Sequence, residues 1–321
     1  MNIDKNNKSA IRKVFGETLA QLGELNENIV VMDADLACST QTQIFGKKFP
    51  ERFFDCGIAE QNMAATAAGL AAEGKIPFIA SFAMFATGRT YDQIRNAICY
   101  PNLNVKIIGT HGGVTVGEDG ATHQALEDIS LMRNIPHMTV IVPADSKECE
   151  EVIKYAALHD GPMYIRISRC NVPNIFDEHY HFDIKKATVM NEGSDISVFT
   201  NGETLAEAII AAEELKKEGI FVEVINVPVV KPLDIQTVVD CAKKTKFSVT
   251  IENHSIIGGL GSAVCEALAS RYPTKVFRIG IHDEFGQSGK SDELLEYYGL
   301  DSKALVKRLR TLYKKETEQQ G

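Results

Sequence analysis

Short apolar runs alternate with amphipathic segments along most of the chain. The runs are four to six residues long and rich in Val and Ile, which is typical of buried parallel strands. The segment 203–218 places Leu205, Ile209 and Leu215 at helical spacing before Gly219 ends it. This alternation predicts helices packed on mostly parallel sheets. The predicted strands are 29–32, 76–80, 105–109, 138–142 and 163–167, followed by 196–200, 222–227, 248–251 and 276–279.

The stretch 171–194 breaks this rhythm. It combines Pro, Asn and Gly with many polar residues, and its apolar residues follow no clear period. We interpret it as the linker between two doubly wound α/β domains, the first over residues 1–185 and the second over residues 186–321. The 321 residues are long enough for two such cores.

Composition excludes several classes of function. The chain has 34 Lys and Arg against 43 Asp and Glu, a net charge of −9, which argues against a protein that coats nucleic acid. No stretch approaches the roughly 18 consecutive apolar residues of a membrane span, and the N-terminus lacks the apolar core of a secretory signal. Seven cysteines without a CxxC pair indicate neither a disulfide framework nor a zinc knuckle. We therefore expect a cytoplasmic protein without a nucleic-acid or membrane partner.

A glycine-rich window, GTHGGVTVGEDGATHQ at 109–124, carries most of the candidate chemistry. It follows a predicted strand, and the carboxyl ends of parallel strands are where α/β sheets bind ligands. Its His111, Glu118, Asp119 and His123 could bind a ligand or move protons. A zinc or iron site made of His111, Asp119 and His123 is a competing interpretation. No HxH or HxxxH element on a helix supports this interpretation, and glycine-rich loops hold metal ligands poorly.

Two further windows are ambiguous when each is taken alone. Glu60, in FFDCGIAEQNM at 53–63, precedes an Ala-rich helix. It could be a first-turn carboxylate that interacts with the helix dipole, or a pocket carboxyl whose pKa is raised by burial. Phe82 and Phe85 could be core residues or one wall of a slot for a flat heteroaromatic ring.

Arg12, Ser39 and Arg169 are candidates for binding a phosphate. Arg169 follows the predicted strand at 163–167, so its guanidinium should emerge at the carboxyl edge of the sheet. In the second half, GGLGSA at 258–263 resembles an anion-binding glycine turn, to which we assign no catalytic role.

Together and in this order, these windows resemble the C-terminal half of transketolase, a thiamine diphosphate enzyme. The resemblance spans nearly the whole chain. It implies a pyrimidine-binding domain over residues 1–185 and a transketolase C-terminal-like domain over residues 186–321. The matching elements are DADLACS at 33–39, CGIAEQNM at 56–63, SFAMF at 81–85, the window 109–124, RISRCN at 166–171, KPLD at 231–234 and ENHSIIGGLG at 252–261.

The resemblance assigns roles residue by residue. Glu60 would hydrogen-bond the pyrimidine ring nitrogen and so promote loss of the thiazolium proton, with Phe82 and Phe85 packed on the pyrimidine and Asp35 and Leu36 at the thiazolium. The expected catalytic residues are Glu60, His111 and His123. The residues expected to bind the substrate are His111, Asp119 and His123 in the channel, and Arg12, Ser39 and Arg169 at its phosphate.

One position departs from the family pattern. Gly88 stands where some members have a tyrosine, and Tyr91 is the nearest candidate to replace it.

The family's GDG turn and downstream asparagine, which hold Mg²⁺, are missing from this sequence. The chain is also too short for three such domains. The resemblance therefore implies a split enzyme, in which a separate N-terminal transketolase chain supplies the diphosphate- and Mg²⁺-binding domain. We expect two copies of each chain around thiamine diphosphate, sugar phosphates as substrates, and little or no activity for this chain alone.

Three alternatives remain. A 2-oxo acid dehydrogenase beta subunit has the same architecture, but the GEDGATHQ loop and the three phosphate candidates favour a phosphosugar. The C-terminal part of deoxyxylulose phosphate synthase shares YDQ at 91–93, but that family usually has Arg where His111 stands. A non-catalytic regulatory or scaffolding subunit would not need Glu60 with its full set of polar residues.

Overall fold

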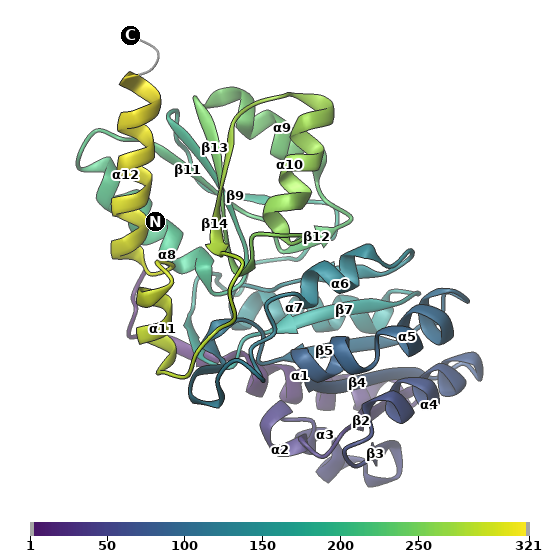
Figure 1. Cartoon of the computed structure of the whole chain (residues 1–321). Coiled ribbons are helices and arrows are strands. Elements are labelled where there is room, and N and C mark those ends of the chain that lie inside the picture. Colours follow the sequence, from purple (N-terminus) through teal and green to yellow (C-terminus); the bar gives the residue numbers. More distant parts are fainter. Residues whose placement is uncertain (1–2, 319–321) are drawn as a thin grey trace.

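The computed structural model describes residues 3–318, whose strands form two main sheets with helices on both faces (Figure 1). The first half of the chain contributes most of a seven-stranded sheet. Its strands are β2 (Ile29–Asp33), β3 (Phe53–Asp55), β4 (Ile76–Phe82), β5 (Lys106–Thr110), β6 (Thr139–Ile141), β7 (Met163–Ile167) and β12 (Val229–Lys231).

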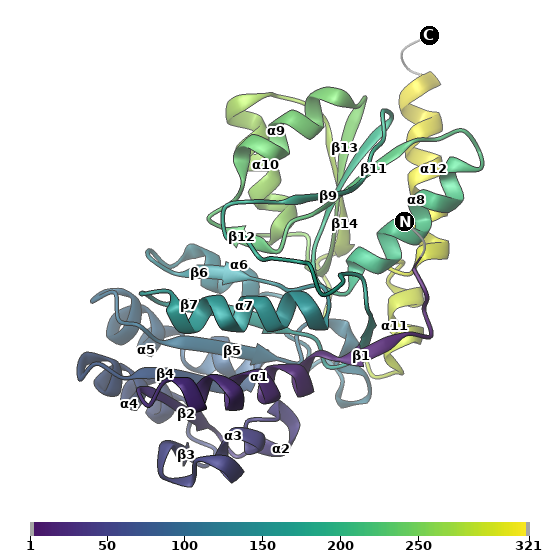
Figure 2. The same ribbon diagram turned by 180° about the vertical axis from the view of Figure 1, so that it is seen from behind.

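These strands lie in the order β12-β6-β7-β5-β4-β2-β3, and all pairs except β12–β6 are parallel. Helices cover both faces because the strands are apolar on both sides. One face carries α4 (Glu60–Ala72), α5 (Tyr91–Gln93) and α6 (Asp128–Asn134), and the other carries α1 (Ile11–Leu25) and α7 (Ser146–Leu158) (Figures 1 and 2). The short helices α2 (Ala37–Thr40) and α3 (Gln43–Lys48) and a 3₁₀ turn at Pro50–Arg52 lead into β3.

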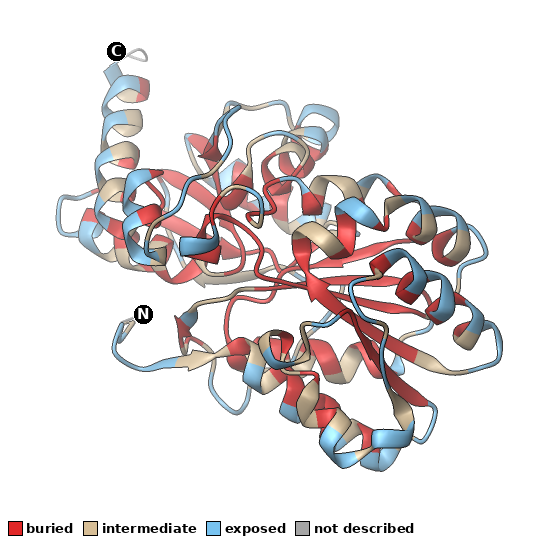
Figure 3. Cartoon of the chain, turned by 60° about the horizontal axis from the view of Figure 1, so that its bottom comes forward, coloured by how far each residue is buried: buried red, intermediate tan, exposed pale blue. Residues whose placement is uncertain are grey.

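The second half builds a five-stranded sheet in the same way. Its strands, β9 (Thr188–Asn191), β10 (Ile196–Thr200), β11 (Val222–Asn226), β13 (Phe247–Ser255) and β14 (Val276–Ile281), lie in the order β14-β13-β10-β11-β9. Helices α8 (Thr204–Lys216) and α12 (Ser302–Glu318) cover one face, and α9 (Ile235–Lys244) and α10 (Leu260–Arg271) cover the other (Figure 1). Helix α11 (Ser291–Tyr297) reaches back toward the first half. The central strands of both sheets are buried (Figure 3).

All nine predicted strands are present within one to four residues of their expected ends, so the expected α/β architecture with mostly parallel sheets is confirmed. The stretch 171–194 is more ordered than expected. It contains β8 (Asn171–Pro173), which pairs antiparallel with β1 (Lys8–Ala10), and β9, which pairs antiparallel with β11. Because these short edge strands are only partly apolar, no hydrophobic run in the sequence predicted them.

Candidate active site

The candidate residues converge on one edge of the seven-stranded sheet. Asp35 and Leu36 follow β2, Glu60 follows β3, and Phe82 ends β4. His111 directly follows β5, and Arg169 lies two residues after β7. Because these five strands are parallel, their carboxyl ends meet at the same edge, where open α/β sheets bind ligands. The sequence windows are therefore brought together by topology alone.

Glu60 is the first residue of α4, and its side chain is only 5% exposed. Its Oε1 accepts a hydrogen bond from Arg89 Nη1 at 2.7 Å. The Arg89 guanidinium also lies over the Phe85 ring, 4.2 Å from its centroid. A pocket of about 440 Å³ opens here, lined by Ile58, Ala59, Glu60, Gln61, Asn62 and Arg89. The Glu60 carboxylate thus faces a cavity and not bulk solvent.

Four aromatic rings form one cluster beside this carboxylate. Phe82 and Phe85 are stacked with 6.0 Å between centroids and 14° between planes. The His111 ring stacks on Phe82 at 3.8 Å, and the His123 ring meets Phe85 edge-on at 5.3 Å. The residues expected at the coenzyme and those expected at the substrate are therefore in direct contact.

A π-helical turn over Phe85–Arg89 presents Phe85 and Arg89 on the same side. The hydroxyl groups of Thr87 and Thr90 donate to the carbonyls of Ala83 and Ala86, four residues back, at 2.7 and 2.5 Å. Such bonds compete with the regular helical ladder and favour local rewinding. Arg89 was not predicted as a site residue, although it lies only four residues after Phe85.

Tyr91 is the nearest tyrosine to the place left open by Gly88. It is half-buried at the start of α5, and its side chain packs against an apolar cluster that includes Met63 and Ile94. Among residues 3–318, the ring contacts of Phe85 are with Phe82, His123 and Arg89. Arg89 is therefore the side chain beside Phe85 and Glu60.

His111 is buried and has a left-handed backbone, with φ of 59°. Such a backbone costs on the order of 1–2 kcal/mol at a residue with a Cβ, and this strain is often found at functional sites. The ring Nδ1 lies 2.9 Å from Thr110 Oγ1, and the Thr110 hydroxyl donates to the Ser81 carbonyl at 3.3 Å. Since that hydroxyl proton is already used, Nδ1 carries the imidazole proton and Nε2 is left as an acceptor.

Burial, followed by the nearby charges of Arg12, Arg169 and His123, lowers the pKa of His111 to about 3. The ring is therefore neutral at pH 7. It can accept a hydrogen bond from a hydroxyl group, but it cannot act there as a cationic acid.

This shift predicts a pH dependence of folding. The ordinary pKa of His111 is 6.5 and the folded one is about 3, so the unfolded chain binds more protons between these values. Above about pH 7, His111 is neutral in both states and does not reduce the free energy of unfolding. As the pH falls below 6.5, the free energy of unfolding decreases by up to about 1.4 kcal/mol per pH unit. Between pH 7 and 5.5, urea unfolding should show wild type losing about 1 kcal/mol more than His111→Asn. Asn tolerates the left-handed backbone, and identical pH dependence of the two proteins would contradict this assignment.

A buried carboxylate missed in the sequence holds the loop after β2. Asp33 Oδ2 accepts hydrogen bonds from the hydroxyls of Thr40 at 2.6 Å and Thr42 at 2.8 Å, and its Oδ1 accepts from the Leu36 amide at 2.7 Å. The Asp35 amide donates to Asp55 Oδ1 at 3.0 Å, and Asp35 has a φ of 62°. These bonds fix the loop that carries the three candidates Asp35, Leu36 and Ser39.

Arg12 joins the two other candidates for phosphate binding. Its Nη1 donates to the Ser39 carbonyl, and its Nη2 donates to the Arg169 carbonyl at 3.1 Å. Burial and the charge of Arg169 lower the pKa of Arg12. The Arg169 side chain is 34% exposed and pairs at 3.2 Å with Glu118 of the glycine-rich window. Arg12 therefore braces the backbone of two segments, whereas Arg169 presents its guanidinium at the surface.

The glycine-rich window folds against the second half of the chain. A Cβ at Gly113, whose φ is 78°, would lie 2.3 Å from Asn253 Nδ2, and one at Gly120, whose φ is 75°, would lie 2.5 Å from Ser288 Oγ. These two glycines are thus required by close packing of the window against the second half. Glu118 and Asp119 are exposed at the tip of the window.

The glycine turn at 258–263 binds an anion of the chain itself. The Glu252 carboxylate accepts from the amides of Leu260 at 2.7 Å and Gly261 at 2.8 Å, at the N-terminus of α10. A Cβ at Gly259 would lie 2.1 Å from Glu252 Oε2. The turn therefore binds an anion, as its sequence suggested. The Glu252 carboxylate occupies the amides of Leu260 and Gly261, so they are not available to a ligand.

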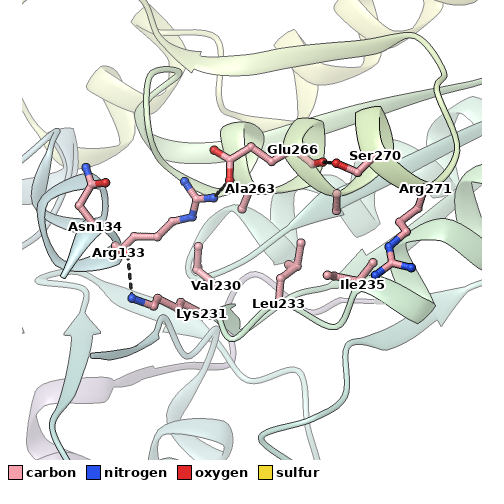
Figure 4. Close-up of a pocket in the computed structure, with 11 residues that line it drawn as sticks. Arg133, Asn134, Val230, Lys231, Leu233, Ile235, Ala263, Glu266, Ser270 and Arg271 are labelled. Carbon is pink, nitrogen blue, oxygen red and sulfur yellow. Dashed lines mark hydrogen bonds and ion pairs between the residues drawn. The ribbon is translucent and has the colours of Figure 1, made fainter. Parts of the chain in front are cut away.

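A separate cleft of about 560 Å³ lies between α6, β12 and α10 (Figure 4). Its charged groups are largely paired with one another. The Lys231 ammonium donates to the Arg133 carbonyl at 3.0 Å and also to the Ile135 carbonyl, and the Arg133 guanidinium pairs with Glu266. None of the residues expected from the sequence to bind coenzyme or substrate lines it.

Within residues 3–318, no three His, Cys, Asp or Glu side chains are grouped so that they could hold a metal ion. His111, Asp119 and His123 therefore form no metal site there. In the same part of the chain, no helix is both long and apolar enough to cross a bilayer.

The fold is thus a pair of α/β domains, with the candidate residues gathered at the carboxyl edge of the first sheet. Residues 7–174 match the profile of the transketolase pyrimidine-binding domain, and residues 185–305 match that of the transketolase C-terminal domain. The chain belongs to the transketolase family.

Individual relatives place the chain more closely. A Methanocaldococcus jannaschii protein, provisionally named a transketolase C-terminal section, is 51% identical over 95% of this chain and 97% of its own length. A Clostridium 6-deoxy-6-sulfo-D-fructose transketolase subunit is 43% identical over 92% of each chain. The solved structure of a split gene transketolase, described as an inactive beta4 tetramer, is 45% identical, with a TM-score of 0.86 over 95% of this chain and 98% of that one. The chain is therefore a transketolase-family subunit of the split type.

Proposed function

We propose that this chain and a separate partner chain form a transketolase that moves a two-carbon ketol unit from a ketose phosphate to an aldose phosphate. The observation that carries the proposal is the convergence, at one sheet edge, of the buried Glu60 carboxylate, the Phe82–Phe85 stack, a neutral His111 and the exposed Arg169 guanidinium. The partner would supply the diphosphate- and Mg²⁺-binding domain, in an assembly with two copies of each chain.

The pocket at Glu60 fits an aminopyrimidine ring. It offers a buried carboxylate for a ring nitrogen, and Arg89 of its lining connects it to the Phe82–Phe85 stack, which could pack on the ring face. Asp35 and Leu36 would border the adjoining thiazolium. Arg89 now pairs with the carboxylate, so a ring nitrogen that bonds Glu60 has to share that carboxylate with Arg89 or displace it. Thiamine diphosphate supplies the carbanion chemistry when bound, and Glu60 holds the proton at the ring nitrogen.

On the substrate side, His111 Nε2 would accept a hydrogen bond from a sugar hydroxyl. His123 lies against Phe85 and Phe82, where it can reach the same substrate. Arg169 would bind the terminal anion, with Arg12 and Ser39 fixing the backbone of the segments on either side. Asp119, at the exposed tip of the glycine-rich window, would contact the sugar at the mouth of the channel.

Reconstitution tests the proposal. The isolated chain should transfer no ketol unit between sugar phosphates, and addition of a complementary chain with a GDG turn, thiamine diphosphate and Mg²⁺ should restore transfer. The inactive tetramer of the related split gene transketolase supports this expectation. Ketol transfer by this chain with no partner would overturn the two-chain assignment. A reconstituted complex that oxidises 2-oxo acids instead would favour the dehydrogenase alternative.

A further inference from the structure

One carboxylate of the second half of the chain reaches the segments at the substrate edge. Glu203 lies at the start of α8, half-buried between the two halves. Its Oε1 accepts from Thr115 Oγ1 at 2.7 Å and from Asn253 Nδ2. Its Oε2 accepts from Ser168 Oγ and from Cys170 Sγ, the latter at 3.2 Å. Four donors thus converge on one side chain.

Three of those donors, all except Asn253, come from the two segments that carry the substrate candidates. Thr115 belongs to the glycine-rich window, four residues after His111. Ser168 and Cys170 flank Arg169 directly. We propose that Glu203 is a positioning residue, whose carboxylate locks the glycine-rich window and the Arg169 segment into one rigid arrangement around the substrate. The inference deepens the function proposed above and rests on it.

Asn253 extends the same connection. Its Oδ1 accepts from the Val114 amide at 2.9 Å, and its Nδ2 also donates to Thr115 Oγ1 at 3.1 Å. Arg166 Nη2 donates to the Asn253 carbonyl at 2.9 Å. A Cβ at Gly113 would collide with this amide, so the window is shaped to receive it. The residues form a continuous polar junction from the second sheet to both segments.

The chemistry of the junction requires a carboxylate. All four partners of Glu203 present hydrogens, and an ionised carboxylate only accepts. Glutamine would turn an NH₂ group toward two donors and leave them unpaired, which costs about 1–3 kcal/mol per buried group. The cavity lined by Glu203 and Asn253 measures about 10 Å³, which is too small for a sugar. Glu203 therefore acts through the two segments and does not touch the substrate itself.

Amide hydrogen exchange on the isolated chain tests the junction directly. Glu203→Gln should speed exchange about tenfold or more at residues 113–119 and 168–170, because charge-assisted hydrogen bonds are lost. Glu207→Gln is the matched control. Glu207 lies one turn further along α8 and binds the Lys5 ammonium at 2.8 Å and the Ser302 amide at 2.6 Å. It should leave both segments unchanged, and equal effects of the two variants would overturn the proposal.

The reconstituted complex provides the second readout. Glu203→Gln should raise KM for the ketose phosphate about 10- to 100-fold, as expected for misplaced binding groups. It should also raise KM for the unphosphorylated sugar, but by less, because the glycine-rich window contributes to binding of both sugars and Arg169 only to binding of the phosphate. If Glu203→Gln does not fold, Thr115→Val removes one of the four donors and should show the same pattern more weakly. An unchanged KM ratio in a folded variant would refute the positioning role.

Different results would refute the proposed function and the positioning role of Glu203. A wild-type complex without ketol transfer would refute the proposed function while the exchange result still decides whether Glu203 orders the two segments. Normal transfer together with unaltered exchange in Glu203→Gln would refute the positioning role alone.

Discussion

Replacing Glu60 by Gln is expected to lower kcat for ketol transfer about 100- to 10,000-fold in the reconstituted complex, the range found when a general acid or base is removed. Glutamine keeps the size of the side chain but cannot hold or release a proton at the ring nitrogen. The buried position of Glu60 and its pairing with Arg89 show that no water-exposed group could substitute. Steady-state kinetics at saturating thiamine diphosphate measures the effect.

Glu73→Gln is the matched control for this experiment. Glu73 is an exposed carboxylate just past the other end of α4, so its replacement should leave kcat unchanged. Gel filtration with the partner chain should show that both variants still assemble. A Glu60→Gln complex with near-normal turnover would favour the scaffolding alternative, in which the catalytic groups lie elsewhere.

Replacing Arg169 by Ala should raise KM for sugar phosphates about 10- to 100-fold, which is what the loss of one or two charge-assisted hydrogen bonds to an anion costs. The guanidinium is exposed at the sheet edge and bonded to Glu118, a partner that a dianionic phosphate can displace. The unphosphorylated sugar should be affected much less. Comparison of the two substrates in the same complex therefore isolates the contribution of the phosphate.

Arg271→Ala controls for the loss of a positive charge, because Arg271 lies on the separate cleft of Figure 4. Equal loss with both forms of the sugar in Arg169→Ala would show that Arg169 supports structure and does not bind the phosphate. Such a result would also remove the main argument against a 2-oxo acid as the natural substrate.

The core strands were predictable because burial on both faces favours a continuous apolar run, as in IVVM at 29–32 within β2. Edge strands leave no such signal. The three-residue β12 pairs with β6, and nothing in its sequence says that it crosses to the other sheet. Contacts between the halves could not be predicted from local sequence patterns either, because the residues that meet, such as Asn253 and Gly113, are 140 positions apart in the chain.

The candidate site was predictable only in part. Residues that immediately follow strands, such as Glu60, His111 and Arg169, come together because parallel strands end at one edge. Arg89 and Asp33 were missed because their importance arises from partners. Arg89 matters through its contact with Glu60, and Asp33 through two threonine hydroxyls. The glycines of the window were noticed, yet the packing that requires Gly113 and Gly120 could be read only from the structure.

The crossover of β12 has a consequence for dissecting the molecule. A fragment ending at residue 185 would lack residues 229–231 and would expose the backbone of β6 along one side of the seven-stranded sheet. Exposed edge strands of different molecules pair with each other and cause aggregation. Cutting the polypeptide at residue 185, between its halves, should therefore yield a first fragment that aggregates.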